Sequence, residues 1–341
     1  MLEGKNILCV TQSFWHEPHR GRHILMKRLS ARNRIVWVNR YGRKSEALLP
    51  ASEVISENLS VYYPGCKFIP DRLIRGPNDG RRLLQTRRYL KKIGFKPDIL
   101  WTHDPHSRRF VRHFGAGGAF TLYYCNDIFG EGKHRLEEER IARAVDLIMV
   151  TSPNLLERLG GSGKAHLVMH GVEGFTPYDY PYRKGELKKV GYVGTIRDCL
   201  DLKLLQQIAR GGRCRLVMAG PVIEMDRLDR KERKEWDDFL HSPLVDYLGP
   251  LPPHELRKHM AQLDLLLMPY DVRLKSELSF PIKFFEYLSV GRPVLATDFF
   301  DWPAGMKRFI HLYRDGEDIQ EALEAAWAAY DENYYRQAVG L

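Results

Sequence analysis

The chain lacks the short signatures of several common enzyme classes. Its 341 residues contain neither G-x-G-x-x-G nor G-x-x-x-x-G-K-[ST], so the glycine-rich phosphate loops of dehydrogenases and P-loop kinases are not expected. The G-x-S-x-G turn of serine hydrolases is also missing. No two aspartates stand two positions apart, which argues against a D-x-D metal site. We therefore expect any catalysis to be metal-independent and to fall outside these classes.

Cysteines and long apolar runs are scarce as well. The five cysteines (9, 66, 125, 199 and 214) are odd in number and show no C-x-x-C spacing, so neither a zinc site nor a disulfide framework is expected. Every apolar run stops well short of the roughly 18 residues that a membrane span needs. The opening "MLEGKNILCV" is typical of a first strand, not of a signal peptide. These features predict a cytoplasmic location.

Positive charge is abundant but unevenly distributed. Residues 1–180 hold 29 Lys and Arg against 18 Asp and Glu, whereas residues 181–341 hold 24 against 25. The segment 72–92 is densest, with eight basic residues in 21. Such a segment is either a solvated helix face or a surface for an anionic partner: phospholipid head groups, a lipid diphosphate or nucleic acid. Because Leu83, Leu84 and Leu90 lie among the charges, we predict peripheral association of residues 72–92 with the inner face of the membrane.

Apolar, β-rich runs alternate with helical stretches from end to end, which predicts an α/β doubly wound architecture with parallel sheets. Expected strands lie at 6–11, 34–39, 59–63, 98–103, 120–125, 146–152, 166–170, 189–194, 214–220, 245–249, 264–270, 292–298 and 309–313. The polar, proline-bearing stretch 174–189 is the expected linker. We predict two Rossmann-like domains, 1–175 and 176–341, that face a central cleft, with the last helix a candidate for crossing back to the first domain.

Open α/β sheets bind ligands at the carboxyl ends of their strands. Gly194 and Gly220 end two strands of the second half, and Thr195 and Arg197 follow the first of them. A glycine there lets the backbone approach a ligand, although glycine is also the ordinary solution for a tight turn.

The stretch "SFPIKFFEYL" (279–288) predicts a helix that begins near Pro281 and Ile282 and carries Lys283 and Glu286. The free N–H groups at the start of a helix, with Lys283 beside them, suit a diphosphate. Glu286, one turn further, can accept hydrogen bonds from the two hydroxyls of a ribose. The alternative is a solvated Lys283–Glu286 ion pair on the helix surface.

Four segments of the second half resemble the nucleotide-sugar-binding domain of GT-B glycosyltransferases. They are "GYVGTIRDCLDLKLLQQIA" (191–209), "RLVMAG" (215–220), "VDYLGPLPPHELRKHMAQLDLLLMPY" (245–270) and "PIKFFEYLSVGRPVLAT" (281–297). The resemblance is to the large retaining family, and within it to bacterial polysaccharide and teichuronic-acid-type enzymes with a P-x-K-x-x-E-Y motif. It implies a GT-B fold and a nucleoside diphosphate sugar as donor, without a further cofactor. The implied reaction is retaining transfer of the sugar to a lipid-linked or saccharide acceptor in cell-surface polysaccharide biosynthesis.

The resemblance also implies roles for single residues. Glu286 would hold the donor ribose, Gly194 and the backbone of residues 281–283 would line the diphosphate, and His103 would lie near the anomeric carbon. The family's first glutamate of E-x7-E falls on Leu278, with Glu277 beside it. Its diphosphate-binding Arg and Lys fall on Thr195 and Asp201, so Arg197 and Lys283 are the expected replacements.

In the first half, His103 and Asp104 follow one expected strand and Asp127 follows another, so all three are candidates for acid–base or positioning roles. The alternative for His103 and Asp104 is a histidine satisfied at a strand end and an aspartate that caps the next helix before Pro105. Trp15 and His16, in the loop after the first strand, are candidates for shaping an acceptor site.

Two other functions remain open from the sequence. The first is a nucleotide-sugar epimerase on the same scaffold, which would need a pair of cleft carboxylates. The second is a binding protein without activity, either an inactive glycosyltransferase-like subunit or a basic nucleic-acid binder. No basic strand interleaved with aromatic residues supports nucleic-acid binding, and we do not expect a nucleic-acid partner.

Overall fold

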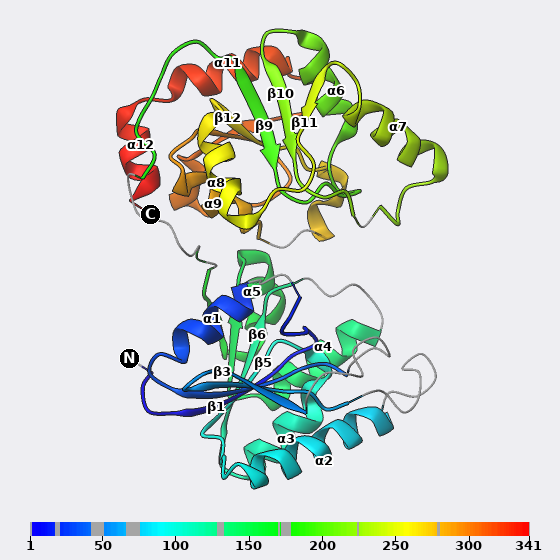
Figure 1. The fold of residues 1–341 in the computed structure, drawn as a ribbon, viewed down its shortest axis with the longest axis vertical. Helices are drawn as coiled ribbons and strands as arrows, with labels where there is room; N and C mark the ends of the chain where they lie inside the picture. Colours follow the sequence, from blue (N-terminus) through cyan, green and yellow to red (C-terminus); the bar gives the residue numbers. More distant parts are fainter. Residues whose placement is uncertain are drawn as a thin grey trace. The chain divides into compact units, whose positions relative to one another are not determined.

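The computed structural model describes residues 2–17, 21–41, 51–65, 76–127, 133–169, 171, 179–223, 225–277 and 280–340. The chain divides into two compact units, Met1–His170 and Gly171–Leu341 (Figure 1). The boundary predicted from the sequence, between residues 175 and 176, falls in the segment 172–178, which lies outside the described residues. Each unit is an α/β layer structure built on its own sheet.

The sheet of the first unit has the strand order β3-β4-β2-β1-β5-β6-β7-β8. Its strands are β1 (Asn6–Val10), β2 (Arg34–Val38), β3 (Ser52–Ser56), β4 (Leu59–Tyr62), β5 (Ile99–Thr102), β6 (Phe120–Cys125), β7 (Leu147–Val150) and β8 (Ala165–Leu167). All pair in parallel except β3, which runs antiparallel to β4. The sequence predicted every strand but β3, an edge strand with one face in solvent: Val54 at its centre is 77% exposed. A polar, half-exposed strand carries no continuous apolar run.

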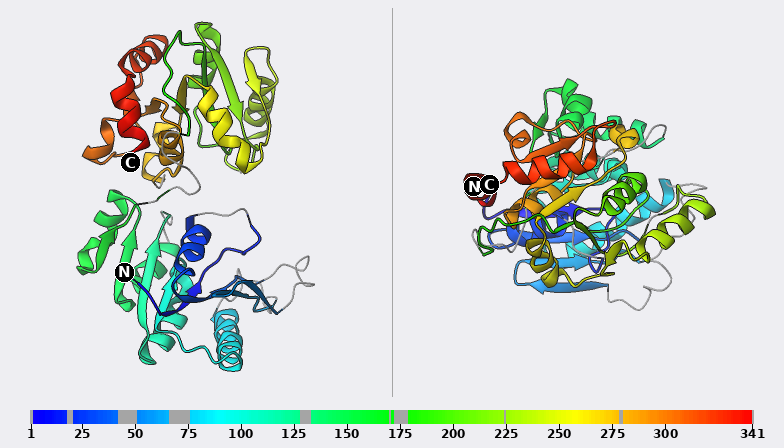
Figure 2. Two further views of the ribbon diagram at one scale, coloured as in Figure 1. Left: turned by 60° about the vertical axis from the view of Figure 1, so that its left-hand side comes forward. Right: turned by 90° about the horizontal axis from the view of Figure 1, so that it is seen from above.

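Helices cover both faces of this sheet. They are α1 (Gly21–Leu29), α2 (Gly76–Lys92), α3 (Arg108–Ala116), α4 (Lys133–Ala144) and α5 (Pro153–Leu159), with short 3₁₀ turns η2 (Pro105–Ser107) and η3 (Gly160–Ser162). One core contains Leu90 of α2, Phe110 of α3, Ile141 of α4 and Leu155 of α5. A second core contains Met26 of α1 with Trp15, Trp37 and Trp101. Helices α1 and α2 therefore lie on opposite faces, as the left view of Figure 2 shows.

The sheet of the second unit is entirely parallel, in the order β11-β10-β9-β12-β13-β14. Its strands are β9 (Lys189–Val193), β10 (Arg215–Ala219), β11 (Val245–Tyr247), β12 (Leu265–Met268), β13 (Val294–Thr297) and β14 (Ile310–Tyr313). Its helices are α6 (Leu202–Gly211), α7 (Arg230–Leu240), α8 (Pro253–Gln262), α9 (Lys283–Ser289), α10 (Ala304–Lys307), α11 (Ile319–Ala329) and α12 (Glu332–Val339), with the 3₁₀ turn η4 (Val272–Glu277). Two mostly parallel sheets with interleaved helices confirm the predicted fold class.

The register of the strands aligns their carboxyl ends. In the first unit Val10 pairs with Val38 and with Thr102, so the residues that follow β1, β2 and β5 leave the sheet at one edge. In the second unit Val193 pairs with Ala219, so Gly194 and Gly220 emerge side by side. The candidate residues His103 and Gly194 therefore both follow strand ends at carboxyl edges, where α/β sheets bind ligands.

The described part of the expected linker, residues 179–188, is fastened to the second unit. Arg183 forms an ion pair of 3.0 Å with Asp264 and donates to the carbonyls of Ala261 and Leu263. Tyr335 of α12 donates to the carbonyl of Tyr180 at 2.7 Å. The last helix thus packs within the second unit, on α9 and on this segment. No helix in the described part of the chain is long and apolar enough to cross a membrane.

Candidate functional site

Gly194 and Gly220 bring two backbone segments together at the carboxyl ends of β9 and β10. Both have positive φ, +152° and +137°, which a residue with a side chain rarely adopts. A Cβ on Gly220 would overlap the carbonyl oxygen of Gly194, and a Cβ on Gly194 would overlap the ammonium of Lys283. The two glycines therefore serve a close approach of chain segments, and the backbone of Gly194 remains half-exposed at this edge.

Lys283 reaches this approach from the first turn of α9. Its Nζ donates to the carbonyl oxygen of Val193 at 2.8 Å and lies 5.1 Å and 5.8 Å from the ring centres of Tyr192 and Tyr287. Desolvation lowers the pKa of Lys283, and the negative charge of Glu286 opposes that shift. An ammonium has three donors, so this cation can bind an anion while it keeps the Val193 bond.

Glu286 is half-buried, and its carboxylate makes no hydrogen bond and no ion pair within the described residues. The Lys283 ammonium is engaged with the Val193 carbonyl instead. The solvated Lys283–Glu286 ion pair considered from the sequence is therefore wrong. The structure instead places the cation of Lys283 and the acceptor-only carboxylate of Glu286 on the same helix, α9. They are close enough for the charge of Glu286 to raise the pKa of Lys283.

The helix begins later than the sequence predicted. Helix α9 starts at Lys283, not at Pro281, and Ile282 occupies the N-cap position without a side-chain hydrogen bond. The N–H groups of Phe284 and Phe285 already bond to the carbonyls of Pro281 and Ile282, and that of Glu286 also bonds to Ile282. Among the described residues, the expected row of free N–H groups is thus reduced to the first positions, Ile282 and Lys283.

The remaining residues predicted around the diphosphate differ in their surroundings. Thr195 is half-buried, and its carbonyl accepts a hydrogen bond from the hydroxyl of Tyr192 at 2.8 Å. Arg197 is exposed. Asp201, where the resembled family carries a lysine, is the N-cap of α6 and accepts from the N–H of Leu204 at 3.0 Å. A capping aspartate cannot take over the role of a cation.

Three tyrosines of this site escaped the sequence reasoning. The hydroxyl of Tyr287 bonds to both the N–H and the carbonyl of Val193, at 3.1 Å and 3.2 Å. Tyr270 follows β12, and desolvation raises its pKa, with the charge of Glu286 contributing in the same direction. Tyr192 lies in β9. Tyrosine is common in buried strands and helices, so only the position of Tyr270 at a strand end could have indicated a site residue.

In the first unit, His103 is buried at the carboxyl end of β5. Its Nδ1 lies 2.7 Å from Oδ1 of Asn126, and its Nε2 has no partner among the described residues. Desolvation lowers the pKa of His103 to about 3, assisted by the charge of Arg22. The imidazole is therefore neutral at physiological pH. Asn126, which the sequence reasoning missed, stands directly before the predicted Asp127.

Asp104 and Asp127 occupy unequal positions. Asp104 is 3% exposed, caps η2 by accepting from the N–H of His106 at 3.0 Å, and also accepts from Ser107 and Gln12. The capping alternative is confirmed, and both carboxylate oxygens are engaged by the protein. Asp127 is 59% exposed and lies 3.8 Å from Arg22. It follows the carboxyl end of β6, next to the strand that ends before His103.

Trp15 and His16 also differ in their surroundings. Trp15 is 3% exposed and packs edge-to-face on Trp37, with 5.1 Å between the rings, so the prediction that it shapes an acceptor site is wrong. A large aromatic side chain in the loop is drawn into the core beneath α1. His16 is exposed and lies 2.9 Å from both the carboxylate of Glu53 and the hydroxyl of Tyr63.

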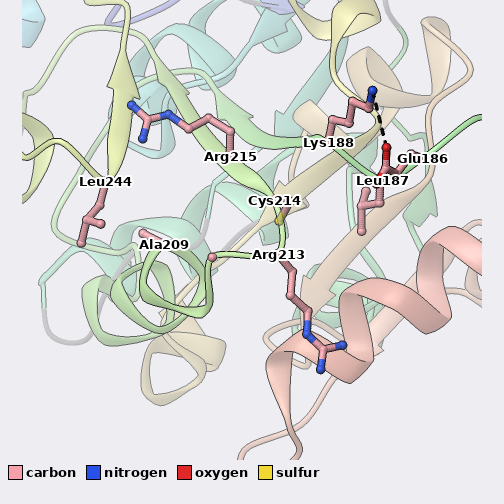
Figure 3. Close-up of a pocket in the computed structure, with 9 residues that line it drawn as sticks. Glu186, Leu187, Lys188, Ala209, Arg213, Cys214, Arg215 and Leu244 are labelled. Carbon is pink, nitrogen blue, oxygen red and sulfur yellow. Dashed lines mark ion pairs between the residues drawn. The ribbon is translucent and has the colours of Figure 1, made fainter.

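One pocket of the second unit lies at the opposite end of β9 and β10 from Gly194 and Gly220. This pocket of about 430 Å³ opens at the amino ends of β9 and β10, between Lys188, Arg213 and Arg215 (Figure 3). Each of these cations is paired with a carboxylate, from Glu186, Glu324 and Asp246 respectively. An anion would have to displace those partners, so this pocket is not the candidate site. Within the described residues no three His, Cys, Asp or Glu side chains are grouped to hold a metal ion.

A known protein family matches part of the second unit. The family of glycosyl transferases group 1 matches residues 188–328, which include Gly194, Gly220, Lys283 and Glu286. Among curated proteins, the chain is 25% identical over 224 residues to the Bacillus subtilis (strain 168) protein named as the teichuronic acid biosynthesis glycosyltransferase TuaH. That match covers 58% of the chain and 55% of TuaH, so the chain is aligned with about half of its relative.

Solved structures show the same fold over the whole chain. Sucrose-phosphate synthase from Thermosynechococcus elongatus superposes with a TM-score of 0.71 at 16% identity, over 98% of this chain and 94% of that one. HepE from Anabaena, determined in complex with UDP-glucose, superposes with a TM-score of 0.66 at 13% identity over the same shares. The chain therefore has the GT-B fold, and the residues that match the group 1 family lie in its second unit.

Proposed function

We propose that the chain is a glycosyltransferase that moves a sugar from a nucleoside diphosphate sugar to a lipid-linked or saccharide acceptor in cell-surface polysaccharide biosynthesis. The observation that carries the proposal is the pair Lys283 and Glu286. A desolvated ammonium lies at the approach of Gly194, and one turn further along α9 a half-buried carboxylate has no hydrogen-bond partner among the described residues. Because the protein does not engage this carboxylate, both of its oxygens can accept hydrogen bonds from a ligand.

The donor would occupy the carboxyl edge of the second unit. Its diphosphate would bind the Lys283 ammonium and the backbone at Gly194, with Arg197 exposed nearby, and its ribose hydroxyls would donate to Glu286. The GT-B neighbour HepE has UDP-glucose bound, which supports a nucleotide sugar as the ligand class. The positive groups would stabilise the charge that develops on the departing nucleoside diphosphate, so that no metal ion is required.

The first unit would hold the acceptor. His103 is neutral, and its buried Nε2 has no partner among the described residues, so it would bond to a sugar hydroxyl but cannot supply a positive charge at neutral pH. The name of TuaH supports a cell-wall polysaccharide as the product class, and a membrane-bound saccharide precursor is the corresponding acceptor. We further propose that the transfer retains the anomeric configuration and takes place at the inner face of the membrane.

A ligand panel tests the donor first. Isothermal titration with UDP, ADP and GDP, and then with their glucose and N-acetylglucosamine derivatives, should find one base preferred by the chain. Transfer to a lipid-linked acceptor should persist in EDTA, and nuclear magnetic resonance of the product should show the anomeric configuration of the donor. Absence of binding to every nucleotide would overturn the proposal. Activity that EDTA abolishes and manganese restores would overturn the metal-independent part alone.

A further inference from the structure

Helix α2 has two unlike faces. Asn78, Arg82, Thr86 and Leu90, four residues apart, are all at most 3% exposed and face the sheet. The opposite side carries exposed cations, Arg87, Arg88, Lys91 and Lys92, with Leu84 43% exposed among them. Arg82 does not belong to the outer face: its guanidinium donates to the carbonyls of Thr11, Val38 and Asn39. One residue of the basic segment seen in the sequence, Arg82, therefore joins α2 to the sheet and does not contribute to the outer surface.

Helix α3 lies beside α2 and continues the outer face (Figures 1 and 2). Phe110, Val111 and Phe114 are buried, whereas Arg109 and Arg112 are exposed. The guanidinium of Arg109 on α3 lies against α2, because a Cβ placed on Gly80 of α2 would lie 2.9 Å from its Nη1. Burial lowers the pKa of His113 on α3, and the charge of Arg87 on α2 lowers it further.

Six cations of this α2–α3 surface are unpaired within the part of the chain that the structure describes: Arg87, Arg88, Lys91, Lys92, Arg109 and Arg112. None of the six forms an ion pair or a hydrogen bond with the described residues through its side chain. Helices α4 and α7, in contrast, pair several of their exposed cations with carboxylates, as Arg143 with Glu139 on α4 and Lys234 with Asp238 on α7. Helix α2 has one acidic residue in 17 and α3 has none in nine. Like charges held together without counter-charges favour an anionic partner.

We propose that the α2–α3 surface docks on the anionic headgroups of a phospholipid bilayer. Arginine and lysine side chains bind lipid phosphates, and the exposed Leu84 can enter the interface between them. Single-stranded nucleic acid fits less well, since it is bound by cations together with free aromatic faces. The one aromatic residue of α2, Tyr89, is already stacked on Tyr62 at 4.3 Å between ring centres. This surface adds α3 to the basic segment 72–92 that the sequence indicated. The proposal does not depend on which nucleotide sugar the second unit binds.

The test uses the full-length chain and sedimentation with vesicles of phosphatidylcholine, with or without phosphatidylglycerol. The wild-type protein should sediment with the anionic vesicles at low salt and be released as salt rises. The R109E/R112E variant, altered on α3 alone, should lose at least tenfold in partitioning, and R87E/R88E/R109E/R112E should lose more. Thermal melting checks that each variant is folded, and R87Q/R88Q/R109Q/R112Q replaces the reversal if it is not.

The matched control is K203E/R230E/K231E/K307E, which reverses four exposed cations of the second unit. It should bind anionic vesicles as the wild type does. Equal loss in the control would show that net charge alone drives binding and would overturn the docking surface. Unchanged binding of R109E/R112E would overturn the contribution of α3. Absence of wild-type binding at low salt, or tighter binding to duplex DNA than to anionic vesicles, would overturn the lipid assignment, whether or not the chain transfers sugars.

Discussion

Glu286 carries a half-buried carboxylate that makes no hydrogen bond and no ion pair with the described residues. If it accepts hydrogen bonds from ribose hydroxyls, Glu286→Ala should raise the dissociation constant of the preferred nucleoside diphosphate at least tenfold, since each charge-assisted bond contributes roughly 1.5–3 kcal/mol. The melting temperature should hardly change, because no protein partner is lost. Calorimetry gives the affinity, and Glu324→Ala, at an exposed residue paired with Arg213, is the control.

A 2′-deoxy nucleotide separates this role from a general effect of the mutation. It should bind the wild-type protein weakly and lose little more in Glu286→Ala, because the two changes remove the same interaction. A variant that melts markedly lower but binds nucleotide normally would instead assign Glu286 to stability.

Gly194 provides a second residue-level prediction. Gly194→Ala places a Cβ where the Lys283 ammonium lies and forces alanine to φ +152°. The control Gly316→Ala has a φ of +93° and no neighbouring atom within 4 Å, so it reports backbone strain alone. Both variants should lose about 1–2 kcal/mol of stability, but Gly194→Ala alone should weaken nucleotide binding, because it displaces Lys283. Equal affinities in the two variants would remove Lys283 from the proposed site.

His103 predicts a pH dependence of stability. Its pKa is lowered to about 3 in the folded protein, against about 6.5 when unfolded. The unfolded state therefore binds the proton first, so stability falls as the pH drops below 6.5, by about 2 kcal/mol at pH 5. His103→Gln, which cannot be protonated, should show a smaller loss of melting temperature between pH 7.5 and pH 5. The exposed residue His254 supplies the control, His254→Gln, which should follow the wild type.

At the scale of elements, α2 is tied to the carboxyl ends of β1 and β2 by Arg82. Its guanidinium donates to Thr11 and Asn39 at 2.7 Å and to Val38 at 3.1 Å. Arg82→Met should destabilise the first unit by about 2–4 kcal/mol, since buried carbonyls lose charged donors. Arg88→Met, at an exposed position of the same helix, should stay within about 0.5 kcal/mol of the wild type. Thermal melting compares the two, and equal effects would contradict the fastening.

Arg82 also shows where prediction from the sequence ends. The strands were predictable, except β3, because buried parallel strands are continuous apolar runs. Nothing in "GRRLLQTRRYLKK" tells Arg82 from Arg81 or Arg88, since the helical phase is decided by the tertiary contacts of Leu90 and Thr86. Burial of an arginine depends on carbonyls contributed by distant strands, and such partners are not visible locally.

The candidate site likewise contains residues that could be predicted from the sequence and residues that could not. Lys283 and Glu286 were recognisable because charges on an otherwise apolar helix are informative, and their spacing is local. Tyr287, Asn126 and the start of α9 were not, because they depend on how β9, β5 and the segment before Lys283 meet other elements. Asp104 could be assigned either way from the sequence, and only its bonds to His106, Ser107 and Gln12 show that its oxygens are occupied.

At the scale of the whole molecule, the two units differ in charge and in the attachment of the segment between them. Residues 179–188 belong physically to the second unit, where Asp264, 6% exposed, receives Arg183 and the N–H groups of Lys188 and Lys189. The indole of Trp327 donates to the carbonyl of Gly185 at 3.0 Å. Folding of the second unit therefore should require this segment but not the first unit.

We predict that a fragment of residues 179–341 folds cooperatively and binds the preferred nucleoside diphosphate with an affinity close to that of the full chain, because Gly194, Lys283 and Glu286 all lie within it. A fragment of residues 189–341 should be less stable by about 3–5 kcal/mol, since a buried carboxylate loses its cation. Arg183→Met in the longer fragment should reproduce most of that loss. Equal melting temperatures for the two fragments would contradict the attachment, whereas a stable 179–341 fragment without nucleotide affinity would mean that the first unit supplies part of the donor site.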